Sequence, residues 1–380
     1  MPLSSALTSD TCAFERPACW WLSAPRLQQE IQSHGSTIKA SACYQLGGAV
    51  LEFAVDDPAL LEAFQQLYAD CAISQVAAAH MPRVRCTLRR GGDPLLLLLT
   101  FEAGAPADPA GAAFHLLRAT QAVPPYSIHD SPITDWRLAG GKLEPVLAAR
   151  GPHVLIAPWQ VSRDFLIEYL AGITLAMQPD VLAVHGASLL MGAAGVMLVG
   201  GSHAGKTTTA LHLAARGHIL FGDELALLRL AASEILPFRR TVNLRPGPRS
   251  PELTVVTGRL DKRQPLKVDD HWVDPYWISE VFPGVCPRSA PLRAVFFLGG
   301  FAERAAVEAF RLTLDDKDVI DWLAQPAIAY GSWGSAPERR TLRLLALVQV
   351  LSRVPCWMLK VGAPLETANL IEQTMRSCQC

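Results

Sequence analysis

The segment 196–224, "VMLVGGSHAGKTTTALHLAARGHILFGDE", constrains the fold of this chain more than any other part of its sequence. Its apolar start leads into a glycine-rich loop, and an amphipathic run follows the loop. Gly200, Gly205, Lys206 and Thr207 satisfy the pattern G-x-x-x-x-G-K-[ST]. This context predicts a buried strand, a phosphate-binding loop and a helix that begins at Lys206.

Each residue type in the pattern has a physical role in holding phosphate. The glycines let consecutive backbone N–H groups point inward at phosphate oxygens, and the helix adds the positive end of its dipole. Lys206 is expected to bridge the β- and γ-phosphates, and Thr207 is expected to ligate Mg²⁺. The predicted nucleotide-binding residues are Gly200, Gly201, Ser202, His203, Ala204, Gly205, Lys206, Thr207 and Thr208.

Two acidic residues, Asp223 and Glu224, follow the apolar segment "HILFG". We expect one strand from His218 to about Leu230 that lies beside the loop's own strand, so that the two acids point to opposite faces. A carboxylate at this place can bind Mg²⁺, orient water or take a proton from an attacking hydroxyl. A solvent-exposed strand end is the alternative interpretation. His185, in "VHGAS", is either a core histidine or a residue of the same site.

The order of elements along the chain predicts an α/β fold. We expect an N-terminal α+β accessory or recognition domain over residues 1–150 and a P-loop domain over residues 151–380. In the first, "YQLGGAVLEFAV" predicts two short strands around a glycine turn, and residues 83–103 and 141–158 each predict a hairpin. Helices are expected over residues 56–71, 158–180, 206–216, 337–355 and 363–377, and further strands over a segment ending at 191 and over 196–199, 293–301 and 356–362.

Composition narrows the classes of function. The 380 residues carry a formal net charge of −1, which argues against a general nucleic-acid-binding protein. The nine cysteines include no two closely spaced pairs, so we expect reduced thiols in a cytoplasmic protein and no zinc site. The apolar run 181–201 is long enough to span a membrane. Its five glycines and its "GAAG" turn favour two buried strands instead, so we expect no membrane segment.

The segment 185–224 resembles the core of the HPr kinase/phosphorylase group and of the looser HPr kinase-related proteins. A His-Gly pair opens a strand, and a glycine turn and a second strand lead into the phosphate loop. The helix then ends in the pair Arg216–Gly217, and the next strand ends in paired acids. A looser similarity runs from about residue 150 to residue 376. The resemblance implies a P-loop fold of the HPr kinase/PEP carboxykinase type and an ATP-dependent kinase that acts on a serine hydroxyl.

The resemblance also implies roles for single residues. Lys206 and the loop hold ATP, and Thr207 helps to bind Mg²⁺. Asp223 is the base for the accepting hydroxyl, Glu224 is a metal-side carboxylate, and His185 lies near the transferred phosphoryl group. The implied acceptor is a peptide or small protein, including ribosomally made precursor peptides. A small-metabolite kinase and a non-catalytic ATP-binding regulator are the alternatives, and a homo-oligomer is compatible with the sequence.

The segment 237–291 departs from that group, which carries a Glu-containing glycine loop after its acids. Here "PFRRTVNLRPGPRS" takes that place, so HPr itself is not the expected acceptor. Arg239, Arg240 and Arg245 either bind phosphate or an acidic peptide, or belong to a solvated basic loop. The aromatic residues of the segment either contact an extended peptide or pack the domains together; they are Trp272, Tyr276, Trp277 and Phe282.

Overall fold

The computed structural model describes residues 20–22, 39–55, 58–78, 81, 83–89, 95–102, 133–139, 142–147, 153–157, 171, 174–175, 178, 180–244, 266–268, 271–310, 312, 320, 323 and 337–378. The chain divides into two compact units. One unit contains Met1–Cys43, Ala49–Ala63 and Ser74–Met177, and the other contains Tyr44–Gly48, Phe64–Ile73 and Gln178–Cys380. The domain boundary expected near residue 150 stays a prediction. Most of the helix expected over 158–180 lies outside the described residues.

Most strands of the first unit belong to a large sheet, whereas β7 (Ile133–Ala139) and β8 (Lys142–Leu147) form a separate pair. The order of the large sheet is β1 (Trp20–Leu22), β9 (His153–Ala157), β6 (Leu95–Glu102), β5 (Arg83–Arg89), β3 (Ala49–Val55), β2 (Ala40–Leu46) and β4 (Ala72–Ile73). The antiparallel pairing of β5 with β6 confirms the hairpin predicted over residues 83–103. The strands predicted on either side of Gly47 and Gly48 and the helix α3 (Ala59–Tyr68) are also confirmed.

The hairpin predicted over residues 141–158 is wrong. β8 (Lys142–Leu147) pairs with β7 (Ile133–Ala139), whereas β9 pairs with β6 and β1. β9 reads "HVLIA" and β6 reads "LLLLLTFE", so both are almost continuously apolar, whereas β8 carries Lys142 and Glu144. Pairing two apolar strands removes more apolar surface from water than pairing β9 with β8.

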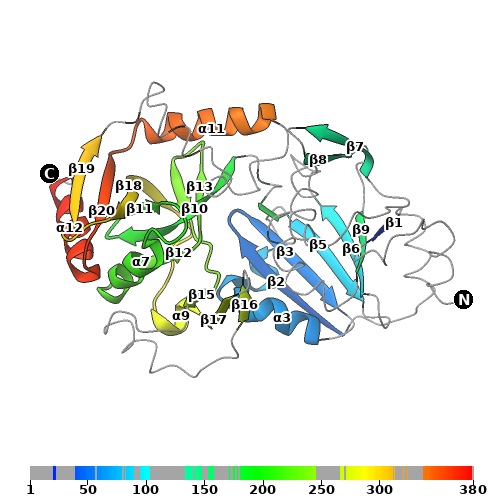
Figure 1. The fold of residues 1–380 in the computed structure, drawn as a ribbon. Coiled ribbons are helices and arrows are strands. Elements are labelled where there is room, and N and C mark those ends of the chain that lie inside the picture. Colours follow the sequence, from blue (N-terminus) through cyan, green and yellow to red (C-terminus); the bar gives the residue numbers. More distant parts are fainter. Residues whose placement is uncertain are drawn as a thin grey trace, which may run out of the picture. The chain divides into compact units, whose positions relative to one another are not determined.

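The second unit is a mixed α/β structure with a large mixed sheet (Figure 1). Its strand order is β11 (Ala194–Val199), β10 (Val181–Met191), β13 (Leu225–Arg229), β14 (Glu234–Leu236), β18 (Ala290–Phe301), β20 (Cys356–Val361) and β19 (Ala306–Phe310), and β12 (Ile219–Gly222) pairs with β10. Because β18 also pairs in parallel with β11, the first five of these strands close into a ring. The short strands β15 (Val242–Leu244), β17 (His271–Tyr276) and β16 (Leu266–Val268) form a separate sheet, and the short helix α9 (Ile278–Val281) follows them.

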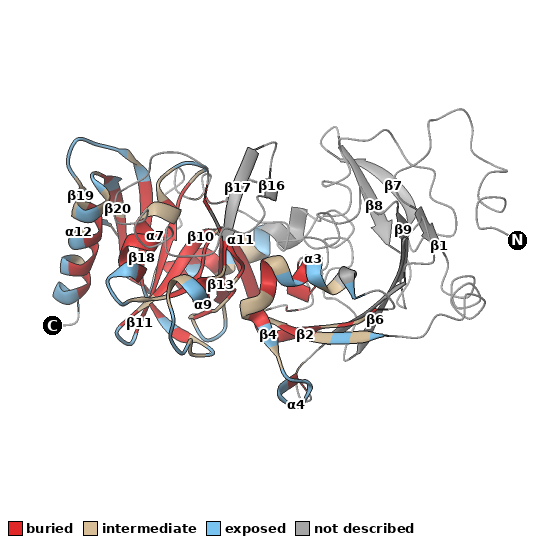
Figure 2. Ribbon diagram, turned by 90° about the horizontal axis from the view of Figure 1, so that it is seen from below, coloured by how far each residue is buried: buried red, intermediate tan, exposed pale blue. Residues whose placement is uncertain are grey.

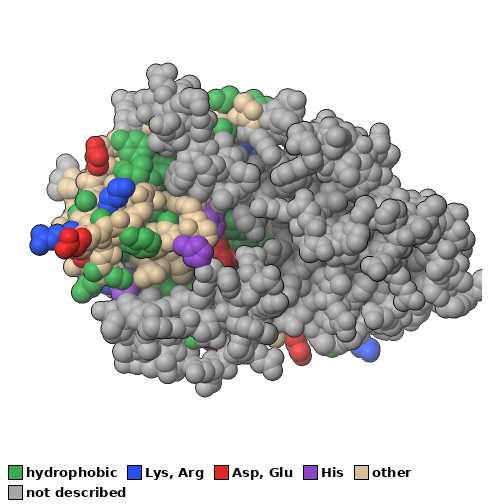
Figure 3. Space-filling view, in the orientation of Figure 1, with side chains coloured by type: hydrophobic (Ala, Val, Ile, Leu, Met, Phe, Trp, Pro, Cys, Tyr) green, Lys and Arg blue, Asp and Glu red, His purple; other side chains and the backbone are tan. Residues whose placement is uncertain are grey.

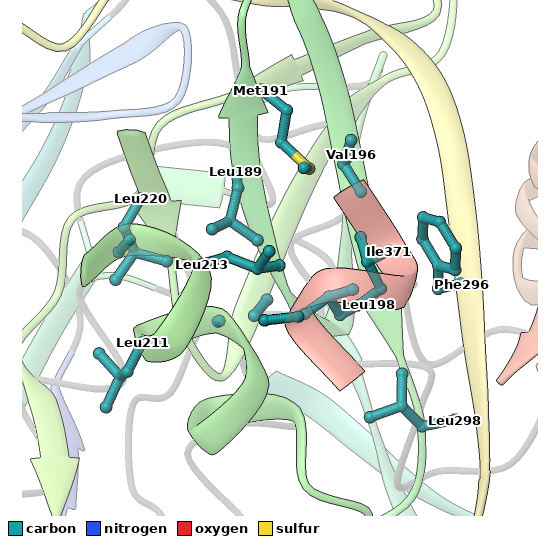
Figure 4. Packing of buried hydrophobic residues seen from close by; sticks show 14 of the residues in the cluster. Leu189, Met191, Val196, Leu198, Leu211, Leu213, Leu220, Phe296, Leu298 and Ile371 are labelled. Atoms are coloured by element: carbon teal, nitrogen blue, oxygen red, sulfur yellow. The ribbon is translucent and has the colours of Figure 1, made fainter. Parts of the chain in front are cut away.

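Helices cover both faces of this sheet. Leu213 of α7 (Lys206–Ala215) and Ile371 of α12 (Pro364–Ser377) share one core with Leu189, Leu198 and Phe296 (Figure 4). The helix α11 (Pro337–Leu351) contributes to a second core together with the alternate β18 residues. Since successive side chains of a strand point to opposite faces, β18 supplies both cores. The central strands β10, β11 and β13 are almost entirely buried, whereas the edge strand β19 is mostly exposed (Figure 2).

The apolar run 181–201 folds as the β10–β11 hairpin, as its glycines predicted. The two strands pair from Gly186 opposite Val199 to Met191 opposite Ala194, and Gly192 in the turn has a φ of 64°. Among the described residues no helix is long and apolar enough to cross a membrane.

The single strand predicted from His218 to Leu230 is wrong. It is broken at Asp223 and Glu224 into β12 and β13, and both parts pair with β10 rather than with β11. β11 has no free edge for β12, because β10 and β18 occupy its two sides. The acids therefore lie in a bend and not on opposite faces of a strand.

An ion pair between the exposed Arg216 and the buried Glu372 fastens the end of α7 to α12. Glu372 accepts two hydrogen bonds of 2.7 Å from the Arg216 guanidinium and lies 3.0 Å from Nε2 of His218. The hydrogen bonds from Arg216 lower the pKa of the Glu372 carboxyl to about 2, against the opposing effect of burial. Arg216 of the pair at the helix end thus binds Glu372, a residue far along the chain.

We predict that Glu372→Gln destabilises the protein near pH 7 by roughly 0.5–1.5 kcal/mol, because Arg216 then loses a charged partner and solvent screens the exposed side of the pair. The pKa of Glu372 is depressed on folding, so the ion pair stabilises the protein fully above about pH 4.5 and this stabilisation is lost as the pH falls towards 2. Chemical denaturation at pH 7 and at pH 3 measures both effects. Glu308→Gln, an exposed carboxylate on β19, is the matched control, and equal losses in the two variants would contradict the prediction.

Candidate functional site

The loop between β11 and α7 contains two residues with left-handed backbone. Gly205, the residue before α7, has a φ of 92°, and His203 has a φ of 64°. Left-handed backbone favours glycine, which explains the glycine at position 205. The structure shows no side-chain cap at this end of α7, so the first amides of the helix are available to an anion.

Lys206 folds back across the loop. Its ammonium donates a 2.7 Å hydrogen bond to the Gly201 carbonyl, and the residue is buried. Burial lowers the pKa of the Lys206 ammonium, and the carboxylates of Asp223 and Glu224 oppose that shift. The positive charge is therefore held inside the curve of the loop.

The first turn of α7 contacts the acidic bend through Thr207. The Thr207 hydroxyl lies 2.9 Å and 3.1 Å from the two oxygens of Asp223, a residue only 2% exposed. Burial raises the pKa of the Asp223 carboxyl to about 6, the Glu224 charge adds to the rise, and the Thr207 hydrogen bond opposes it. A hydroxyl that donates its hydrogen to a carboxylate keeps its lone pairs for a cation.

Glu224 has an unusual backbone and connects several residues of the site. Its φ is 66°, and its carbonyl accepts hydrogen bonds of 3.0 Å from the Gly186 amide and from Nδ1 of His185. One Glu224 carboxylate oxygen lies 3.4 Å from Nη1 of the buried Arg240. Positive φ costs a non-glycine residue free energy, and such residues cluster at functional sites.

His185 is neutral at physiological pH. Burial lowers its pKa to about 4, the nearby Lys206 charge lowers it further, and the hydrogen bond to the Glu224 carbonyl opposes this shift. Because a carbonyl can only accept a hydrogen bond, Nδ1 carries the proton and Nε2 is left as an acceptor. His185 is partly buried and also lines the cavity of the site, so the core and the functional interpretations both apply to it.

A cavity of about 460 Å³ brings together most of the residues predicted from the sequence. His185, the loop residues 202–208 and Glu224 line it, and histidine and hydrophobic side chains are exposed on the same described face in Figure 3. Asp223 lies behind the wall of the cavity, and Gly201 lines a neighbouring cavity. The sequence did not indicate the remaining wall, which comes from Phe301, Val361, Gly362 and Pro364.

The arginine and aromatic residues singled out in segment 237–291 are buried or partly buried wherever their side chains are described; Arg239, Trp277 and Phe282 are partly buried. Arg240 is buried and paired with Glu224, so a solvated loop is the wrong interpretation for it. Tyr276 is buried, and Nε1 of Trp277 donates a 3.0 Å hydrogen bond to the Gln66 carbonyl. Tyr276 and Trp277 therefore pack within the protein. Arg245 and the Trp272 side chain lie outside the described residues.

The donors of the site fit Mg²⁺ bound together with phosphate. Within the described ranges no group of three or more His, Cys, Asp or Glu side chains is arranged around a metal position. Mg²⁺ usually takes one or two protein oxygens and completes its shell with phosphates and water. The Thr207 hydroxyl and the Asp223 carboxylate are oxygens of that kind, and they already contact each other.

No protein-family model matches this sequence, and a search of curated proteins finds no match. Among solved structures, the chain is similar to the Hpr(Ser) kinase/phosphatase from Coxiella burnetii. The two share 12% sequence identity, and the match covers 52% of this chain and 90% of that one at a TM-score of 0.26. The interpretation of the site therefore rests on its own geometry.

We predict that Lys206→Met weakens binding of Mg-ATP by about 10- to 100-fold, which corresponds to the loss of about 1.4 to 2.8 kcal/mol of charge-assisted contact. Thermal stability without ligand should not fall, because burial disfavours the ammonium that is removed. Isothermal calorimetry and thermal unfolding measure the two effects. Lys360→Met is the matched control, since the exposed Lys360 donates a similar 2.8 Å hydrogen bond to the Gly299 carbonyl. Unchanged Mg-ATP affinity in Lys206→Met would remove the phosphate-loop interpretation.

Proposed function

We propose that this protein is an ATP- and Mg²⁺-dependent kinase that transfers the γ-phosphoryl group of ATP to a serine hydroxyl of a peptide or small protein. The contact between the Thr207 hydroxyl and the buried Asp223 carboxylate is the observation that carries the proposal. This contact joins the phosphate-binding loop to the acidic bend. A loop that only bound an anion would not need a carboxylate beside it, whereas phosphoryl transfer uses a carboxylate to help hold the metal ion.

The loop and Lys206 bind the triphosphate. Amides at the start of α7 face the anion, and the Lys206 ammonium, now bonded to the Gly201 carbonyl, exchanges that bond for phosphate oxygens. Bound Mg²⁺ supplies positive charge that offsets the negative charge developing on the phosphates. The Thr207 oxygen ligates this ion, and Asp223 orients the Thr207 hydroxyl by accepting its hydrogen.

The acidic residues divide the remaining tasks. The family resemblance implied that Asp223 takes the acceptor's proton and that Glu224 lies on the metal side, and both acids were predicted as metal ligands together with Thr207. Asp223 is buried against Thr207, however, whereas the Glu224 side chain is 35% exposed and lines the cavity with His185. We therefore assign Asp223 to the metal side, and we assign Glu224 and Nε2 of His185 to the accepting hydroxyl. The hydroxyl oxygen forms the new bond to phosphorus, the bond to the β-phosphate oxygen breaks, and the hydroxyl proton passes to one of these two acceptors.

The nature of the acceptor is the finer part of the proposal. A serine side chain presents a primary hydroxyl on a short stem, which suits a cavity wall that carries Glu224 and His185. The chain also contains, besides the unit with the phosphate loop, the first, mainly N-terminal unit, which a kinase for a small free metabolite does not need. Both points favour a polypeptide acceptor.

The proposal is tested by incubating the protein with γ-labelled ATP, Mg²⁺, a serine-containing peptide library and a panel of free hydroxy metabolites, followed by mass spectrometry. We expect label on serine. Label on a metabolite alone would overturn the polypeptide acceptor and leave the kinase. Bound ATP without any transferred label would indicate a regulator that uses ATP without phosphoryl transfer.

A second prediction concerns the contact that carries the proposal. Thr207→Val should raise the Mg²⁺ concentration needed for half-maximal turnover by about 10- to 100-fold, because it removes an oxygen ligand. Thr207→Ser keeps the hydroxyl and is the matched control, which should stay near wild type. Asp223→Asn should resemble Thr207→Val, whereas Glu224→Gln should lower the rate of transfer at saturating Mg²⁺. If Asp223→Asn instead lowers the rate of transfer at saturating Mg²⁺ and Glu224→Gln raises the Mg²⁺ requirement, Asp223 is the base and the assignment proposed here is wrong.

A further inference from the structure

A β-bulge at the end of β18 turns one aromatic side chain towards the phosphate loop. Leu298 pairs with Leu359 and Phe301 pairs with Val361, so β18 contains one residue more than β20 between these pairs. The extra length falls at Gly299 and Gly300, and Gly300 has a φ of 104°. Leu298, Leu359 and Val361 all belong to the core under α7. The bulge thus places Phe301 on the α7 side, where a regular strand would place it on the other side.

Phe301 occupies this position without being buried. The residue is 68% exposed, although large aromatic residues gain most when they leave water. A methyl group added to Gly205 would lie 3.4 Å from Cε1 of Phe301, so the ring lies beside the last glycine of the loop. The backbone bends at the bulge and at the left-handed Gly300 to place the Phe301 ring here, although the ring stays exposed. Packing in the core therefore does not explain the position of this ring.

A second cavity, of about 630 Å³, lies next to this ring. The loop residues 201–204 line one side of it, and residues 297–301 and Met358 line the other. It shares Phe301 and the loop residues 202–204 with the phosphate cavity. A methyl group on Gly299 would lie 2.8 Å from the Met358 sulfur, so a larger residue there would displace the cavity wall.

We propose that Phe301 is the stacking platform for the nucleobase of the bound nucleotide, and that the base occupies this second cavity. The inference rests on the nucleotide binding proposed above and adds the place of the base. When the phosphates lie at the loop, the ribose connects them to a base that reaches the adjacent cavity. The flat face of the base can stack on the exposed Phe301 ring and contact the Met358 thioether and the wall formed by Gly299 and Gly300. The ligand is then a nucleoside triphosphate whose base lies in this cavity. The walls of the cavity are mostly apolar and contact the ring more than the polar groups at its edge, so ATP and GTP bind with similar affinity.

The test compares two ligands that differ only by the nucleoside: Mg-ATP and Mg-tripolyphosphate. Phe301→Ala should weaken Mg-ATP binding by about 5- to 100-fold, the usual effect of one lost stacking contact, and should leave Mg-tripolyphosphate binding unchanged. Phe301→Trp keeps a ring and should retain ATP affinity. Val285→Ala is the control for an exposed apolar residue, because Val285 is 89% exposed and lies outside both cavities.

The outcomes separate the two proposals. If the wild-type protein binds both ligands equally, or if Phe301→Ala weakens neither or both alike, the base does not stack on Phe301 and the phosphate loop stands. If the wild-type protein binds neither ligand, the proposed function fails and this inference fails with it. Loss of peptide phosphorylation in Phe301→Ala without loss of ATP affinity would assign the ring to the acceptor and overturn the inference.

Discussion

The hydrogen bond between the Thr207 hydroxyl and the buried Asp223 carboxylate joins the first turn of α7 to the bend between β12 and β13. In the proposed mechanism this contact sets where the cation lies, because it fixes one oxygen donor and buries one negative charge beside it. The other polar groups are arranged around it. Lys206 lies inside the loop, and Glu224 connects the bend to His185 through its carbonyl. The chemistry proposed for the site depends on this contact.

The site contains several features that are unfavourable on their own. Asp223 and Lys206 are buried although burial disfavours their charged forms, and Glu224 and His203 have left-handed backbone. The packing of the rest of the second unit stabilises the fold enough to offset these unfavourable features. Two apolar cores cover the two faces of the sheet, and the Arg216–Glu372 ion pair fastens α7 to α12. Strained and desolvated groups of this kind are expected where a protein binds charged ligands.

Much of the second unit was predictable from local patterns. The β10–β11 hairpin, the helix after the loop, and the later elements β18, α11, β20 and α12 follow apolar periodicity, glycine turns and helix caps. Two predictions failed for one reason. β12 was expected beside β11, and β8 was expected to pair with β9. Both errors concern which strand takes which edge, and that choice depends on competition among distant strands rather than on the strand itself.

The sequence by itself determined the chemical groups of the site, because the spacing of Gly200, Gly205, Lys206 and Thr207 is local and a loop of that form follows from it. Tertiary structure alone decided the rest. Pairing with β10 broke the predicted strand at the acids and gave Glu224 its left-handed backbone, and pairing of β18 with β20 created the bulge that exposes Phe301. Such features arise where residues far apart in the chain must share hydrogen-bonding edges and core space, and no local pattern contains that constraint.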